Sequence, residues 1–213
     1  MKPAISICLM SLVLAGCAAA PIVASYALSG AVIGATAYQM HEVYRDGELS
    51  FQVANSDTKK TNYELIRKSS SLAIYPTQDS NDGKIVDIAR EITSLRIASA
   101  SSTKKWIKDQ NIDLAALTRE EKIEMLAKMG KSLNVDLTVL SESAGHKVDV
   151  KFFGATQADY IFDTMFVSAK TKKEVLAEQY IVRSDGLTVN NAEIIPLLAT
   201  GIAKRFNEIR KGV

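Results

Sequence analysis

The feature that most constrains this fold is a pair of alternating segments near the carboxyl end, at residues 160–169 and 174–182. Side chains of different polarity alternate along each segment, as they do along a strand whose one face rests on a core. The four residues between the segments, Lys170 to Lys173, are polar and form a short turn. The sequence therefore predicts an antiparallel hairpin, and the rest of the chain has to cover it.

Upstream, short apolar runs predict buried strands at 72–76 and 135–140, and apolar residues spaced by three and four predict a helix over 84–96. A capping box at 118–121 predicts the start of a second helix, and a closing helix is expected over 191–211. Strands separated by helices tend to pair in parallel. The predicted fold class is therefore α/β, with a mixed sheet (parallel early strands, antiparallel late hairpin) and helices on both faces.

Weaker patterns complete the expected order of elements. Residues 49–53 alternate and predict a strand, followed by a polar loop over 55–60. A short strand is expected at 97–100, and Ser101 or Ser102 is expected to cap a helix that continues through Trp106. Residues 147–153 predict another strand, which places His146 in a loop before it.

The amino terminus predicts an export signal. Residues 5–14 are mostly apolar. This segment has the length of a signal's hydrophobic region and is too short to span a bilayer. They end at Leu14-Ala15-Gly16-Cys17, which resembles the lipobox of bacterial lipoproteins. The alternative is an ordinary secretory signal that is cut near residues 18–20.

The lipobox resemblance implies that residues 1–16 are removed and that Cys17 carries a diacylglycerol and an N-acyl chain. Ala18 follows the cysteine, which by resemblance to enterobacterial sorting rules implies the outer membrane of a Gram-negative bacterium. The other cysteine, Cys8, would leave with the signal, so no disulfide or thiolate metal site is expected in the mature chain. No cofactor is expected beyond the acyl groups.

Residues 18–40 contain no charged side chain and are long enough to cross a hydrocarbon core of ~30 Å as a helix. Small residues that recur at spacing four would let such helices approach closely. The face formed by these small residues contains Ala27, Gly30, Ala31, Gly34 and Ala35. One interpretation is a membrane element that inserts and self-associates. The other is an apolar tether, or an apolar helix docked on the folded domain.

The domain that follows resembles one shared by curli-secretion lipoproteins, the TolB N-terminal domain and lipoprotein activators of penicillin-binding proteins. The resemblance rests on the run 72–76, on the helix-to-strand pattern over 128–141 and on the hairpin over 163–176. This chain departs from the family pattern because lysine occupies the position of the hairpin glycine and Ser141 that of a strand-ending glycine. The size fits small lipoproteins that resemble a neisserial surface antigen. The resemblance implies a periplasm-facing assembly or regulatory module with no catalytic residues.

Catalytic and metal-binding motifs are not found in the sequence. The two histidines, His41 and His146, are not spaced as metal ligands, and neither nucleophile nor phosphate-loop motifs occur. The formal net charge is only +2 and the basic residues are dispersed, which disfavours nucleic acid as a partner. Trp106, beside two lysines, is a candidate partner contact. The alternative is that it packs under the following loop.

These observations predict three regions: a signal at 1–16, a lipidated apolar segment at 17–45 and a periplasmic α/β domain at 46–213. The expected function is a lipid-anchored, non-catalytic module that binds envelope proteins in assembly, secretion or cell-wall regulation. The alternative is a homo-oligomer that inserts through 18–40 and forms part of a secretion or pore-like assembly.

Overall fold

The hairpin predicted near the carboxyl end forms the middle of a six-stranded sheet in the computed structural model. The residues that the structure describes are 49–56, 61–76, 82–149, 157–185 and 191–212, all in the second of two units of the chain, Arg45–Val213. The lipobox with Cys17, the small-residue face within 18–40 and His41 lie outside the described residues.

The strands are β1 (Leu49–Ser56), β2 (Ser71–Ile74), β3 (Arg96–Ile97), β4 (Leu137–Asp149), β5 (Gln157–Ser168) and β6 (Lys173–Ser184). The helices are α4 (Tyr63–Lys68), α5 (Asp82–Thr93), α6 (Ala100–Gln110), α7 (Arg119–Ser132) and α8 (Asn191–Lys211), with a 3-10 turn, η1, at Leu114–Ala116. The strand order across the sheet is β1-β6-β5-β4-β2-β3.

The pairing directions confirm the predicted mixed sheet. β2 runs parallel to both β3 and β4, whereas the β4–β5 and β5–β6 pairs are antiparallel. The sequence analysis assigned no pairing direction to β1, which pairs antiparallel with β6 at the edge of the sheet. The physical reason is that β1 joins the late hairpin rather than β2, so no helical crossover links it to a neighbouring strand.

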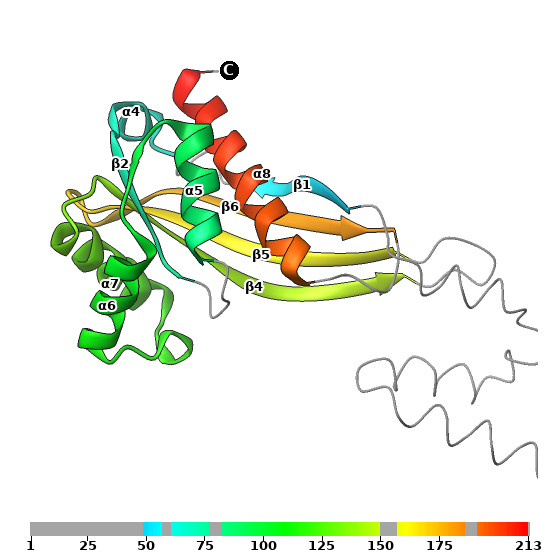
Figure 1. Cartoon of the computed structure of the whole chain (residues 1–213), viewed down its shortest axis with the longest axis horizontal. Helices are drawn as coiled ribbons and strands as arrows, with labels where there is room; N and C mark the ends of the chain where they lie inside the picture. The colour runs from blue at the N-terminus through cyan, green and yellow to red at the C-terminus, as the bar shows by residue number, and fades with distance from the viewer. Residues whose placement is uncertain (1–48, 57–60, 77–81, 150–156, 186–190, 213) are drawn as a thin grey trace, which may run out of the picture. The chain divides into compact units, whose positions relative to one another are not determined.

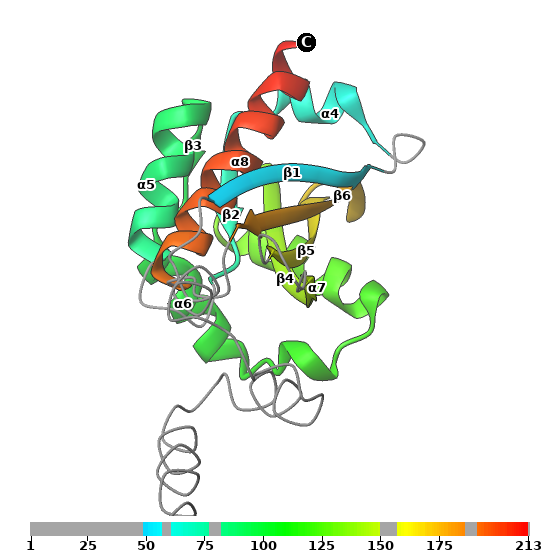
Figure 2. The same cartoon turned by 90° about the vertical axis from the view of Figure 1, so that its right-hand side faces the viewer.

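Helices cover both faces of the sheet, as predicted (Figures 1 and 2). On one face, α4, α5 and α8 enclose a core with stacked rings of Phe166 and Phe206, whose centroids are 5.0 Å apart. On the other face, α7 contributes Leu126 and Met129 to a second core with Val167. Successive side chains along a strand point to opposite faces of the sheet, so β5 places Phe166 in one core and Val167 in the other.

The strand β4 is longer than the sequence pattern predicted. A loop was expected around His146, but β4 runs without a break from Leu137 to Asp149 and includes this histidine. A register shift between Ser143 and Gly145 absorbs one extra residue, and Gly145 has a φ of 140°. A β-bulge at a glycine keeps two strands paired across a polar stretch that does not alternate.

Two helix starts also differ from expectation. The six-residue helix α4 was not predicted, and its N-cap is Asn62, whose side chain accepts a hydrogen bond from the Leu65 backbone N–H. The helix α6 is capped by Ser99 rather than by Ser101 or Ser102. The predicted capping box of α7 is confirmed, because Thr118 and Glu121 exchange hydrogen bonds at its first turn.

Candidate functional site

Within the residues that the structure describes, helices cover the α7 side of the sheet only in part, and this is where a candidate binding surface lies. Along β5, Met165 and Val167 are buried against α7, whereas Asp159, Ile161 and Asp163 on the same side of the strand are partly or fully exposed. Figure 1 shows β4, β5 and β6 extending past the helices α6 and α7. No described helix lies over this distal part of the face.

Three cross-strand pairs between β5 and β6 form this surface, which we call the ladder face. Its residues are Asp159 with Arg183, Ile161 with Ile181, and Asp163 with Gln179. Paired residues in an antiparallel sheet point to the same side, and successive rungs on one side are two residues apart. An apolar rung therefore lies between two polar rungs.

In each polar rung, side-chain hydrogen bonds join the two paired residues. Arg183 donates from Nε and Nη2 to the two carboxylate oxygens of Asp159 at 2.7 and 2.9 Å, a bidentate pair. Gln179 donates from Nε2 to Asp163 at 2.9 Å. These bonds hold four polar side chains in place around the two isoleucines.

Among the charged groups of the ladder face, the carboxylate of Asp159 has a pKa below its ordinary value. The hydrogen bond from Arg183 lowers the pKa of Asp159, and the nearby cations of Arg183 and Lys147 add to this, against a smaller opposing effect of burial. Lys147 is the partner of Asp159 on β4. The carboxylate therefore stays ionised and paired at neutral pH.

The boundary of the ladder face is set by an ion pair between α7 and β4. Lys122 Nζ lies 2.8 Å from a carboxylate oxygen of Glu142. Every residue of β4 beyond this point, from Ser143 to Asp149, is exposed. The core under α7 thus ends at Glu142, and the strands continue beyond it as an exposed sheet.

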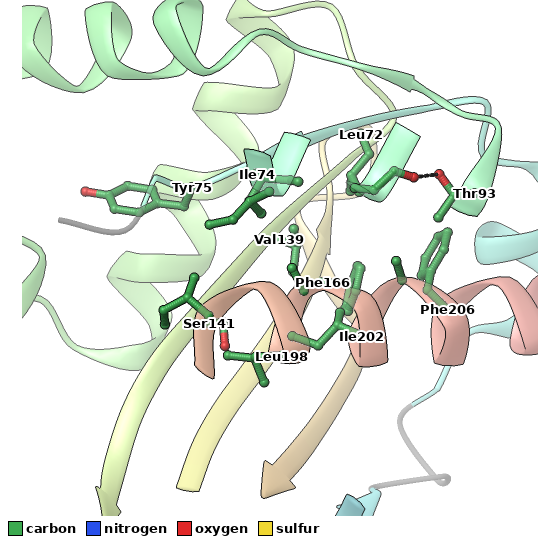
Figure 3. A pocket seen from close by; sticks show the side chains of 15 residues that line it. Leu72, Ile74, Tyr75, Thr93, Val139, Ser141, Phe166, Leu198, Ile202 and Phe206 are labelled. Carbon is green, nitrogen blue, oxygen red and sulfur yellow. Dashed lines mark hydrogen bonds between the residues drawn. The ribbon is translucent and has the colours of Figure 1, made fainter. Parts of the chain in front are cut away.

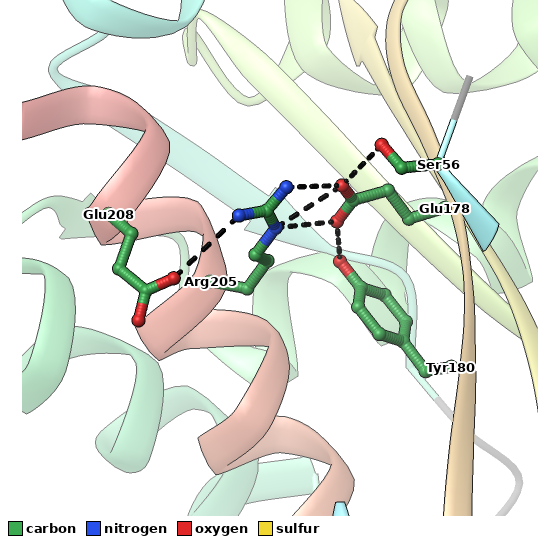
Figure 4. A network of polar contacts seen from close by, with 5 residues as sticks. All are labelled: Ser56, Glu178, Tyr180, Arg205 and Glu208. Carbon is green, nitrogen blue, oxygen red and sulfur yellow. Dashed lines mark hydrogen bonds and ion pairs between the residues drawn. The ribbon is translucent and has the colours of Figure 1, made fainter. Parts of the chain in front are cut away.

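The opposite side of β6 carries a buried polar network (Figure 4). Glu178 is 4% exposed and accepts hydrogen bonds from Ser56 Oγ at 2.7 Å, from Tyr180 at 2.6 Å and from Arg205 Nη2 at 3.1 Å. Burial raises the pKa of Tyr180, and the neighbouring Glu178 carboxylate raises it further. The network joins β1, β6 and α8. Both carboxylate oxygens of Glu178 accept hydrogen bonds from other side chains of the protein, so the role of the network is structural.

A narrow apolar cavity, which we call the slot, lies between α5, α8 and the sheet (Figure 3). Its volume is about 70 Å³, and none of its fifteen lining residues is charged. The helix α5 lines it from Ile85 to Thr93, a length of about 12 Å at the rise of an α-helix. The slot is therefore an apolar void in the core on the α8 side of the sheet.

One end of the slot is buried and the other is partly exposed. Thr93 and Phe206 at the inner end are 3% and 2% exposed, whereas Tyr75, Ser141 and Ile195 at the other end are only partly buried. Protein interiors are close-packed, and a space of this size costs about 2 kcal/mol when nothing fills it. The mouth lies at the carboxyl end of β2, the side on which open α/β sheets bind ligands.

The structure describes two residues that the sequence singled out. Trp106 on α6 is partly buried and packs on the core under α7 beside Ile112, Leu114 and Leu117. Its role as a partner contact stays a prediction. His146 is exposed on β4, on the opposite side of the sheet from the ladder face.

The ladder face and the slot were not predicted from the sequence. In the sequence, polar and apolar residues alternate over 159–163 and over 179–183. This pattern could have predicted the ladder face only if the register between the two strands had been known. Among the described residues, no three His, Cys, Asp or Glu side chains are grouped to hold a metal ion. Within the same residues, no helix combines the length and the apolar character needed to cross a membrane.

No protein-family model matches the sequence, and no curated protein matches it. Solved structures to which the chain is similar include the lipoprotein GNA1162 from Neisseria meningitidis, at 14% identity and a TM-score of 0.40, covering 64% of this chain and 96% of that one. They also include a PelC dodecamer from Paraburkholderia phytofirmans, at 9% identity and a TM-score of 0.35, covering 74% of this chain and 96% of that one. At these values the likeness carries no conclusion about function.

Proposed function

We propose that this chain is a lipid-anchored protein of the bacterial envelope whose α/β domain binds other proteins without catalysing a reaction. The observation that carries the proposal is the tetrapeptide Leu14-Ala15-Gly16-Cys17 at the end of a signal-like apolar run. Two or three acyl chains at Cys17, at ~0.8 kcal/mol per buried methylene, would hold the domain firmly on a membrane. The residue after the cysteine, Ala18, favours the outer membrane.

The ladder face is the best candidate surface for binding a protein partner. Protein interfaces combine a central apolar patch with a polar rim, and Ile161 and Ile181 lie between two hydrogen-bonded polar rungs. The bidentate Asp159–Arg183 pair fixes two side chains before binding, which reduces the entropy lost on association. Both signs of charge are present, so we expect a protein surface of mixed charge rather than a polyanion.

The anchor is tested by intact-mass analysis of the protein from membranes and by its distribution after cell fractionation. We expect residue 17 to carry diacylglycerol, and Cys17→Ala to release the protein from the membrane fraction or leave its signal uncut. Unmodified Cys17 in a protein that is free in the periplasm would overturn this part of the proposal.

The binding surface is tested by a photo-crosslinking amino acid placed at Ile161 or Ile181 in cells. We expect both positions to capture the same envelope protein, and a control position on the exposed side of α7, Lys128, to capture none. Reversing the charge by Arg183→Glu should weaken the capture at least tenfold. Capture that is equal at all three positions, or unchanged by Arg183→Glu, would refute a role for the ladder face.

Self-association is a second candidate function. The small-residue face from Ala27 to Ala35 favours close helix contact, and the edge strand β1 has neither charge nor proline over Leu49–Ser56. Among the described strands, β1 pairs only with β6, and edge strands that lack such protection can pair with another chain. Detergent-solubilised protein that behaves strictly as a monomer in light scattering would remove this candidate.

A further inference from the structure

We propose that a cluster of basic side chains at one end of the sheet binds the anionic surface of a phospholipid membrane. We call this cluster the basic tip. It contains Arg96, Lys131, Lys170, Lys172 and Lys173, all of them exposed. They come from β3, from the end of α7 and from the hairpin of β5 and β6. The basic residues are dispersed in the sequence, and the fold brings these five to the same end of the sheet.

Close contacts hold the three parts of the basic tip side by side. A Cβ at Gly130, in the last turn of α7, would lie 2.7 Å from the Cβ of Ala169, where the hairpin turn begins. The guanidinium of Arg96 donates a hydrogen bond to the carbonyl oxygen of Asn134, in the connection from α7 to β4. The backbone N–H of Asn134 in turn donates to the carbonyl oxygen of Lys131 at 3.3 Å. The cations of β3, α7 and the hairpin therefore share one surface.

The carboxylates at this end of the sheet are already engaged with other groups. One carboxylate oxygen of Asp136 accepts four hydrogen bonds from two serines. Glu174, whose side chain is only 10% exposed, is paired with Arg119. On α4, Glu64 is paired with Lys68. The basic tip therefore has an excess of positive charge, although the formal net charge of the whole chain is only +2.

The composition of the basic tip favours a membrane over a protein partner. Four of its five cations are lysines, whose ammonium groups act as point charges on flexible stems, whereas geometric recognition of single carboxylates favours arginine. A protein interface also has an apolar centre. The large apolar side chains exposed among the described residues are Val53, Tyr63 and Val148, and none belongs to the basic tip. Clusters of roughly four to eight Lys and Arg are typical of surfaces that attract anionic headgroups.

The basic tip is distant from the point where the chain enters the domain. Leu49, the first residue of β1, pairs with Ser184, whereas Lys173 lies at the other end of β6 (Figure 1). The twelve residues of β6 span about 40 Å. A membrane contact at the basic tip is therefore separate from an acyl anchor at Cys17, and the inference does not depend on that anchor.

The test measures contact between the basic tip and lipid headgroups. The full chain carries Cys8→Ala and Cys17→Ala, and a fluorophore is attached to a new cysteine, either Thr171→Cys in the hairpin turn or Asp185→Cys at the opposite end of β6. The vesicles contain phosphatidylcholine alone or with phosphatidylglycerol, and spin-labelled headgroups quench a fluorophore that touches them. We expect phosphatidylglycerol to cause quenching at Thr171→Cys and to make no difference at Asp185→Cys.

Two matched variants each remove three exposed lysines. The tip variant carries Lys170→Gln, Lys172→Gln and Lys173→Gln, and the control variant, on α5 and α6, carries Lys84→Gln, Lys105→Gln and Lys108→Gln. The vesicle concentration that gives half of the quenching should rise at least tenfold in the tip variant and less than twofold in the control. Raising the NaCl concentration from about 0.1 M to about 0.5 M should weaken binding of the parent chain as the tip variant does.

Equal changes in the two variants, or quenching at Thr171→Cys that needs no phosphatidylglycerol, would overturn the proposal. If circular dichroism shows that the tip variant does not fold, Lys131→Gln replaces it, because this substitution leaves the hairpin intact. The vesicle concentration at half quenching should then rise at least threefold.

A competitor distinguishes a lipid surface from an acidic protein. Poly-glutamate is added at the same concentration of negative charge as the phosphatidylglycerol. We expect most of the quenching at Thr171→Cys to remain, since all five cations can face a continuous anionic surface at once. Complete reversal of the quenching would contradict a membrane partner and assign the basic tip to an acidic protein.

Discussion

Glu178 on β6 and Arg205 on α8 form an ion pair in which the carboxylate side chain is 1% exposed and the guanidinium 30%. The nearest oxygen and nitrogen are 3.1 Å apart, and the hydrogen bond to Glu178 raises the pKa of Arg205. The same carboxylate accepts a hydrogen bond from Ser56 at the end of the edge strand. One buried charge therefore links the sheet edge to the long carboxyl-terminal helix.

Arg205→Met should destabilise the domain by about 3 kcal/mol, because it leaves the Glu178 carboxylate buried without its cation. Urea unfolding followed by circular dichroism measures the change. The control is Lys204→Met, an exposed neighbour on the same helix, which should change the free energy of unfolding by less than about 0.5 kcal/mol. Equal effects of the two substitutions would show that the ion pair contributes no stability.

Gly201→Ala should destabilise the domain by about 1–3 kcal/mol, since it overpacks a close contact. A Cβ at Gly201 would lie 2.4 Å from the ring of Phe51, which packs against Tyr180. Gly83→Ala on α5 is the matched control, because its Cβ would meet nothing within 4 Å, and it should be neutral or stabilising. Thermal unfolding of the two variants provides the comparison, and a stable Gly201→Ala would contradict the tight packing of α8 on β1.

Asp136→Asn should reduce the stability at neutral pH by about 1–2 kcal/mol. One carboxylate oxygen of Asp136 accepts four hydrogen bonds from the backbone and hydroxyl groups of Ser70 and Ser71, at 2.8 to 3.1 Å. Although burial acts in the opposite direction, these bonds lower the pKa of Asp136. They connect the start of β2 to the residue before β4, and so fix the parallel pairing of the two strands.

The pH dependence of this contribution has a definite sign. Because the pKa of Asp136 is lower in the folded state, its contribution is present above the unfolded value of about 3.9 and is lost as the pH falls through the folded value. Urea midpoints from pH 7 to pH 2 should therefore fall more steeply for the parent protein than for Asp136→Asn. Urea midpoints that fall equally with pH in the two proteins would refute the contribution of the Asp136 carboxylate to stability.

Thr118→Ala should destabilise the domain by about 1 kcal/mol, because it removes half of the capping box of α7. Glu121→Gln should have a smaller effect, since an amide oxygen can still accept from the Thr118 backbone, where the carboxylate now accepts at 2.8 Å. Chemical denaturation of both variants shows which substitution lowers the free energy of unfolding more. A larger effect of Glu121→Gln would show that charge at the helix start matters more than the threonine cap.

The sequence predicted the elements that have strong local signals. The α7 capping box and the apolar stripe of α8 formed as expected, and the turn expected at 170–173 lies one residue earlier, at 169–172, because each depends on residues close together in the chain. It did not predict α4, whose six residues are too few to show a helical period. The partner of β1 was also missed, since antiparallel pairing with β6 depends on contacts more than a hundred residues apart.

The ladder face shows why register is the hardest quantity to obtain from sequence. Counting back from the turn pair Ser168 and Lys173 would place Asp159 opposite Val182. A register shift between Phe166 and Val167 moves its partner to Arg183 instead. A one-residue slip moves every side chain to the other face, so the salt bridge could not be foreseen without this bulge.

The strands β4 and β5 have thirteen and twelve residues, about 40 Å each, yet the core under α7 ends where Lys122 meets Glu142. Under the proposed function, folding depends on the part of these strands that lies under α7, and recognition depends on the part beyond it. Substitutions near Ile161 would then alter which molecule is recognised while the free energy of unfolding stays nearly constant. Natural selection could adjust specificity at one end of the sheet and thermal tolerance at the other as separate traits.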